Sequence, residues 1–211
     1  MKKIFFIIFS ILLIDQFLKI YIKTHFELGS GFCIFPFFCI FLVENPGMAY
    51  GFHLATGDIG KILLSFSRLF LIFFILFFLY KHVRKKSSNY LIIPIVMILS
   101  GAIGNFLDSA LYGLLFNTGT IYNKEYRKWI PYSGISKISF NDGYASLMKG
   151  CVVDIFYFPI INTNFPNWVP FFGGKNFQFF KPVFNVSDIV IFIGMILFLL
   201  FKRRIKNIKF L

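Results

Sequence analysis

The sequence has 211 residues, of which 57% are hydrophobic, 15% are charged and 33 are phenylalanine. This composition excludes an ordinary soluble domain and is typical of a protein that crosses a membrane several times. The net charge of +13 does not indicate nucleic-acid binding, because the basic residues gather beside apolar runs, in residues 1–3, 81–86 and 202–209.

Four apolar runs of about 18–23 residues match the ~20 that a membrane-spanning helix needs. We predict transmembrane helices over residues 4–22, 62–80, 90–112 and 184–201. The first run is not expected to be a cleaved signal peptide, because Asp15 and Lys19 interrupt it and no small-residue cleavage site follows it. The basic flanks place the N-terminus, the 81–89 connection and the C-terminus in the cytoplasm, so residues 23–61 and 113–183 are expected on the outer side.

The two outer segments differ from the spans in composition. Residues 31–47 offer only about 12 apolar residues before a Pro-Gly turn, too few to span, and their aromatic and β-branched side chains predict strands or structure at the membrane interface. The second outer segment is rich in Tyr, Asn and Gly and predicts loops with tight turns. No internal repeat is visible, and we expect one integral membrane domain over residues 1–211.

The few polar residues inside the predicted spans gather toward the outer side. Asp15 lies roughly 16 Å along the first helix at 1.5 Å per residue, and Lys19, one turn later, shares its face and can pair with it. In the third helix one stripe, at positions i, i+3, i+4 and i+7, carries Gly101, Gly104, Asn105 and Asp108. A small residue there lets a neighbouring helix approach closely, and an amide or carboxylate can hydrogen-bond across.

Further polar residues approach the same level from outside. Asn185 and Asp188 sit at the outer end of the fourth span, Asp154 lies in a short apolar run, and a tight turn carries Asn45 and Gly47. Singly, each polar group has a structural explanation: a helix-end Asp caps, an Asp–Lys pair is an ion pair, and an Asn braces its neighbours. Because all of them fall at one outer level, we interpret them together as a site.

Carboxylates dominate this site and decide its chemistry. The His and Cys residues show no metal-ligand spacing, so no metal or cofactor is expected, and Cys33, Cys39 and Cys151 are expected to serve as apolar packing. Two facing carboxylates that share one proton can activate water for attack on a carbonyl. Asp154 and Asp188 suit that role best, although the 34 residues between them leave their distance open.

Five sequence blocks resemble, in order, the motifs of lipoprotein signal peptidases, the type II signal peptidases of bacteria. The blocks are DQFLK (15–19), NPGMAYGF (45–52), GAIGNFLD (101–108), VVDIF (152–156) and FNVSD (184–188). The resemblance covers the chain except for residues 113–150. It implies an all-α membrane protein with four transmembrane helices, an outer-side β-cradle and, in this chain, a long extracytoplasmic insertion.

The resemblance also implies an activity and its residues. Members are aspartic endopeptidases of the bacterial cytoplasmic (inner) membrane that cut prolipoproteins just before a diacylglyceryl-modified cysteine, and globomycin inhibits them. Asp154 and Asp188 would be the catalytic pair. The supporting or substrate-binding residues would be Asp15, Lys19, Asn45, Gly47, Gly104, Asn105, Asp108 and Asn185. Prolipoproteins and membrane lipids are the expected partners, and we expect a monomer.

Three departures from the family pattern stand out. Ser109 follows Asp108 where many members carry Arg, and Ser187 stands where Ala is usual. The connection between Asp108 and Asp154 is also longer than usual and is compatible with a lid, a substrate-gripping loop or a partner surface.

Three other functions are compatible with parts of the sequence. A proton-coupled transporter also uses intramembrane Asp–Lys pairs. A metal-dependent lipid-head-group transferase would use Asp108, Asp154 and Asp188 as oxygen ligands. A non-enzymatic assembly factor would tolerate the loss of either carboxylate of the pair.

Overall fold

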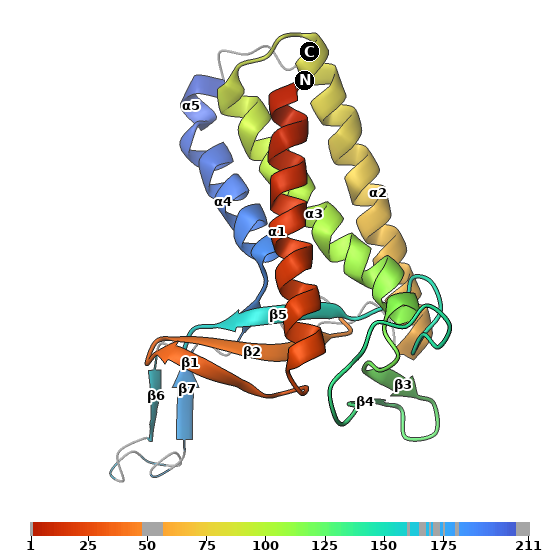
Figure 1. Ribbon diagram of the computed structural model, residues 1–211. Coiled ribbons are helices and arrows are strands. Elements are labelled where there is room, and N and C mark those ends of the chain that lie inside the picture. The colour runs from red at the N-terminus through yellow and green to blue at the C-terminus, as the bar shows by residue number, and fades with distance from the viewer. Residues whose placement is uncertain are drawn as a thin grey trace.

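The computed structural model describes residues 2–47, 57–159 and 182–205, the strands 161–164 and 176–179, and residues 168, 170 and 174. The helices are α1 (Lys2–His25), α2 (Gly57–Arg84), α3 (Asn89–Leu115), α4 (Val186–Leu200) and α5 (Lys202–Ile205). The strands are β1 (Gly31–Phe35), β2 (Phe38–Asn45), β3 (Ile121–Asn123), β4 (Lys128–Ile130), β5 (Val152–Tyr157), β6 (Ile161–Asn164), β7 (Asn176–Phe179) and β8 (Val183–Phe184). The strands lie at one end of the helical bundle, and the start of α1, the α2–α3 connection and α5 lie at the other (Figure 1).

The helices confirm a membrane protein. Within the described part of the chain, α1, α2 and α3 are long and apolar enough to cross a bilayer, at three of the four predicted positions. The apolar helix α4, with 15 residues, occupies the fourth. Large apolar side chains point outward along α1 and α2, among them Phe5 and Phe70 with more than two thirds of their surface exposed. Such a surface is stable in the hydrocarbon core of a bilayer, because exposing these apolar side chains to water would be unfavourable.

Close contact between α3 and α4 fixes the part of the bundle nearest the sheet. A Cβ atom on Gly101 would lie 2.3 Å from the carbonyl oxygen of Ser187, and one on Gly104 would lie 2.0 Å from the Ser187 hydroxyl oxygen. Only glycine permits this approach, so the predicted role of the small residues on this stripe is confirmed.

The main sheet has the strand order β1-β2-β5-β8, with every pairing antiparallel. Val43 of β2 faces Asp154 of β5, and Phe156 of β5 faces Phe184 of β8. Because β8 runs directly into α4, this register brings Asp154 beside the first turn of that helix. Strands predicted over 31–47 are therefore confirmed as β1 and β2, whereas residues 48–52 of the second block lie outside the described residues.

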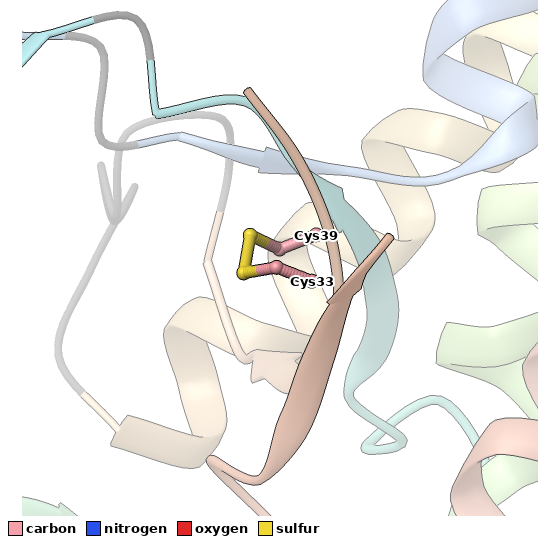
Figure 2. Close-up of a disulfide and its surroundings, with 2 residues drawn as sticks. All are labelled: Cys33 and Cys39. Carbon is pink, nitrogen blue, oxygen red and sulfur yellow. A yellow bond between two sulfur atoms is a disulfide. The ribbon is translucent and has the colours of Figure 1, made fainter. Parts of the chain in front are cut away.

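The expectation that all three cysteines are packing residues is wrong for two of them. Cys33 and Cys39 face each other across the β1–β2 hairpin and form a disulfide (Figure 2). The pairing depends on the hairpin register, which the six-residue separation alone does not specify. Cys151 is a buried free thiol, and burial raises its pKa to about 12, so it stays protonated and inert.

The buried ion pair between Lys23 and Glu44 ties the long connection after α3 to α1 and β2. Lys23 of α1 pairs with Glu44 of β2, and the Glu44 carboxylate accepts a hydrogen bond from the backbone N–H of Thr120 at 2.6 Å. The Lys23 ammonium also donates to the Thr118 carbonyl at 3.1 Å and lies 5.0 Å from the centre of the Phe116 ring. These contacts hold residues 118–120 of the connection against α1 and β2.

Candidate active site

A buried cluster of charges joins α1 to α3. The Lys19 ammonium lies 2.9 Å from an Asp15 oxygen and 2.8 Å from an Asp108 oxygen, and all three side chains are fully buried. Lys19 also donates to the side-chain oxygen of Asn105 at 3.2 Å. Gln16 donates to Asp108 at 2.9 Å and to the Gly104 carbonyl at 3.3 Å. The predicted Asp15–Lys19 pair is thus confirmed as part of a larger network.

This cluster holds the start of α4. Asp15 accepts a hydrogen bond from the backbone N–H of Ser187 at 2.8 Å, and Asn185 caps the helix by accepting from the Asp188 N–H at 2.9 Å. The Asp188 carboxylate accepts in return from the Asn185 N–H at 3.3 Å, which completes a capping box. Asp188 is therefore a helix cap as well as a candidate site residue.

The β5 carboxylate, Asp154, is buried, with 5% of its surface exposed. It accepts hydrogen bonds from the side-chain amides of Asn185 at 2.7 Å and Asn45 at 3.4 Å. Burial, together with the negative charge of Asp188, raises its pKa to about 8, against the opposing effects of Lys19 and the two amides. This shift favours the protonated form of Asp154 at neutral pH.

The two asparagines between α3 and α4 connect this carboxyl group to Asp188. Asn105 donates to the Asp188 carboxylate at 2.8 Å and accepts from the Asn185 amide at 3.1 Å. Asn185 in turn donates to Asp154, while Asp188 remains partly exposed. A buried carboxyl group with a raised pKa is thus linked through Asn185 to a more accessible one, an arrangement that can supply an acid and a base to one substrate.

All ten residues that the sequence placed at the site belong to one hydrogen-bonded network. Asp15, Lys19, Asn105, Asp108, Asp154, Asn185 and Asp188 are connected through the contacts above, Asn45 reaches Asp154, and the Gly47 N–H donates to the Asn45 side chain at 2.9 Å. Gly104 joins through its carbonyl and its contact with Ser187. The Asp108 carboxylate faces Lys19, Gln16 and the Val153 N–H, so it braces β5.

The sequence of this chain matches the family model described as signal peptidase (SPase) II over residues 7–203. The chain belongs to the signal peptidase II family. It is therefore an aspartic peptidase and a multi-pass protein of the bacterial inner membrane.

Individual relatives agree with this assignment. The chain is 39% identical to a lipoprotein signal peptidase of Porphyromonas gingivalis, over 92% of this chain and 79% of that protein. It is 30% identical to a lipoprotein signal peptidase of Amoebophilus asiaticus, over 90% of this chain and 73% of that protein. Its fold is similar to that of a bacterial membrane enzyme solved by the in meso method at 2.3 Å resolution, with a TM-score of 0.61, 21% identity, and 99% and 92% of the two chains covered.

Sequence reasoning missed two polar residues of this peptidase site. Gln16 links Asp15, Asp108 and the Tyr112 hydroxyl, which donates to it at 3.1 Å. Arg68 is the one charged residue in the predicted span 62–80. It could have been found because a charge at membrane depth indicates a functional site.

Arg68 also bears on the first departure from the family pattern. Its guanidinium donates to the hydroxyl of Ser109, the residue that stands where many members carry Arg. At the second departure, the Ser187 hydroxyl is buried and has no hydrogen-bond partner among the described residues. That hydroxyl packs closely against Gly104.

Proposed function

We propose that this peptidase removes signal peptides from prolipoproteins by cleaving before a diacylglyceryl-modified cysteine, with Asp154 and Asp188 as the catalytic pair. The observation that carries the proposal is the pair itself. Asp154 is buried with a pKa raised to about 8, and Asp188, linked to it through Asn185, is partly exposed. Family membership supports the substrate class, since the relatives that match most of the chain are lipoprotein signal peptidases.

The proposed reaction uses one proton held by the pair. Asp188 takes a proton from a water molecule, whose oxygen forms a bond to the scissile carbonyl carbon. The proton on Asp154 stabilises the negative charge that develops on the carbonyl oxygen. When the carbon–nitrogen bond breaks, the proton on Asp188 passes to the leaving amine. The products are a carboxyl end on the signal peptide and a free amine on the lipidated cysteine.

The other network residues support this pair. Asn105 and Asn185 orient the two carboxyl groups, and Asn45 and Gly47 hold the Asp154 side from the end of β2. Asp15, Lys19 and Asp108 hold α1, α3, α4 and β5 together, and Gly104 lets α4 approach. No step of the mechanism needs a metal or an organic cofactor.

The proposed topology has four spans, with α4 as the fourth, and one integral membrane domain over residues 1–211. Two observations support an extracytoplasmic sheet and site. The Cys33–Cys39 disulfide belongs to an oxidising compartment. The basic segments 81–86 and 202–205 lie at the end of the bundle opposite the sheet (Figure 1). Basic residues are enriched on the cytoplasmic side of membrane proteins.

In this orientation the sheet β1-β2-β5-β8 serves as a cradle for an extended peptide. The acyl chains of the substrate stay in the bilayer, so the enzyme does not have to desolvate them. We also propose that the enzyme acts as a monomer and that globomycin inhibits it.

The test is cleavage of a synthetic prolipoprotein peptide by the purified chain in lipid, followed by mass spectrometry. Two matched substrates, with and without the diacylglyceryl group on the cysteine, are compared with and without EDTA. We expect cleavage before the lipidated cysteine only, unchanged by EDTA. No cleavage would overturn the proposed function, equal cleavage of both peptides would overturn the substrate class, and loss of activity in EDTA would favour a metal-dependent enzyme.

A further inference from the structure

Arg68 of α2 is hydrogen-bonded to residues that lead to both halves of the proposed catalytic pair. It is partly buried, and Asp108, Asp154 and Asp188 are close enough to act on its charge. Its hydrogen bonds nevertheless go to neutral groups: the Ser109 hydroxyl, the Asn105 carbonyl at 3.5 Å and the Gly47 carbonyl at 3.3 Å. A charge in such a position is costly for the fold, which favours a role beyond packing.

The acceptors of Arg68 belong to the two arms that hold the pair. On one side, the Gly47 carbonyl is fixed by Arg68 while the Gly47 N–H donates to Asn45, which donates to Asp154. The other side runs through Asn105, whose carbonyl accepts from Arg68 and whose side-chain amide donates to Asp188.

Ser109 strengthens the second arm. Its hydroxyl accepts from Arg68 and donates to the same Asn105 carbonyl at 3.1 Å. The guanidinium therefore bridges the turn after β2 and the C-terminal half of α3, two segments that no other described hydrogen bond of α2 joins.

We propose that Arg68 is a positioning residue for the catalytic pair: by bridging the Gly47 carbonyl and the Asn105–Ser109 turn, it sets the separation of Asp154 and Asp188. The inference rests on the proposed function of that pair. It adds a residue from α2, a helix that contributes no other group to the site, and it assigns the role to a position that none of the five motif blocks contains.

The bridge requires a guanidinium. Its planar fork offers several N–H groups in fixed directions, so it can reach acceptors on both segments at once. A lysine ammonium is a single point on a flexible stem, so it keeps the charge but cannot hold both segments in place. Ser109 is the residue whose hydroxyl Arg68 now contacts, so an arginine at position 109 would place its guanidinium in the same space between α2 and α3.

The test compares four proteins with the wild type on the lipidated peptide. Arg68→Met removes the bridge and the charge, Arg68→Lys keeps the charge, and Arg68→Ser combined with Ser109→Arg moves the guanidinium to α3. Lys61→Met is the matched control, because Lys61 is a buried cation on the same helix whose ammonium has no hydrogen-bond partner in the part of the chain that the structure describes. Thermal unfolding of each protein in the same lipid or detergent checks the fold.

We expect Arg68→Met to lower kcat by about 100-fold, the effect of a displacement near 1 Å, with KM changed less than about threefold. Arg68→Lys should fold as the wild type does and still lose about tenfold in kcat, whereas the relocated arginine should recover at least about tenfold over Arg68→Met. Lys61→Met should cleave like the wild type.

Several outcomes would overturn the inference. One is an Arg68→Lys protein with wild-type kcat, which would show that no bridge is needed. Another is a Lys61→Met protein that loses as much activity as Arg68→Met, since only charge would then matter. Failure of the relocated arginine to recover activity in a folded protein would count equally against it. If the wild type does not cleave the peptide at all, the proposed function fails first, which separates the two conclusions.

Discussion

Replacing Lys19 by methionine tests whether the buried charge cluster holds the fold together. The Lys19 ammonium lies 2.9 Å and 2.8 Å from carboxylate oxygens of Asp15 and Asp108, and none of the three side chains is exposed. Methionine keeps most of the volume and removes the charge. Two buried carboxylates then face each other's charge without the cation that compensates them.

Removing one partner of a buried ion pair costs about 3–5 kcal/mol, because the remaining charge stays desolvated. At ~2–4 °C per kcal/mol for a chain of this size, we expect a fall in Tm of about 6–20 °C. The assay is thermal unfolding in a fixed detergent, followed by circular dichroism. Adding Asp15→Asn to Lys19→Met removes one of the uncompensated charges, so the double variant should recover part of the loss.

A matched control is the ion pair between Lys149 and Asp58, which has the same 2.8 Å separation with side chains 28% and 34% exposed. Solvent screens such a pair, and losing it costs about 0–1 kcal/mol. Lys149→Met should therefore change Tm by no more than a few degrees. Equal losses for Lys19→Met and Lys149→Met would refute the reasoning from burial.

Three further predictions concern the pair, the hairpin and the α3–α4 contact. The pKa of Asp154 is raised from 3.8 to about 8, so the folded state binds this proton more tightly than the unfolded state, and stability should fall as pH rises between these values. Above pH 8, kcat/KM should fall about tenfold per pH unit. A flat profile of kcat/KM from pH 7 to 10 would contradict this. Replacing Cys33 and Cys39 by serine should lower the free energy of unfolding by about 2 kcal/mol, because the bridge closes a short loop. If the wild type and the double serine variant had the same Tm without reductant, the bridge would not form. Gly104→Ala should cost about 1–3 kcal/mol, and Ser187→Ala should recover part of that, since the new Cβ lies 2.0 Å from the Ser187 hydroxyl; a stable Gly104→Ala protein would mean that α4 sits farther from α3.

The structural features that could be predicted from the sequence depend on the composition and residue spacing of a single helix. The three long spans follow from long runs that are mostly apolar, and the Asp15–Lys19 pair follows from the helical spacing of four residues. The glycine on the α3 stripe lies against α4 for the same reason. The residue types alone favoured Asp154 and Asp188 as the pair but left the distance between them open. The resemblance of the motifs to the family supported the same pair.

The missed features depend on contacts between elements far apart in the sequence. The Cys33–Cys39 disulfide needs the register of a hairpin, and the Lys23–Glu44 pair needs a fold that buries it under residues 116–144. Arg68 was missed for a different reason. Acidic residues were weighed by their depth in the membrane, and the same rule applied to basic residues would have identified it.

The packing of residues 116–144 also narrows the role of the long connection. Lys23 contacts Thr118 and Tyr132, and the Cys151 N–H donates to the Tyr144 hydroxyl at 2.8 Å. These contacts anchor the connection on both sides of the β3–β4 hairpin. We therefore expect this part of the connection to keep its position when substrate binds.

The most direct test of the account is cleavage of the lipidated prolipoprotein peptide by Asp154→Asn and Asp188→Asn. Each substitution keeps the shape of the side chain and removes the ionisable proton, while Asp142→Asn, at an exposed position of the long connection, is the control. We predict that both variants fold, that each loses roughly 10²–10⁴-fold in kcat, and that Asp142→Asn cleaves like the wild type. Near wild-type cleavage by either folded variant would contradict the assignment of Asp154 and Asp188 as the catalytic pair.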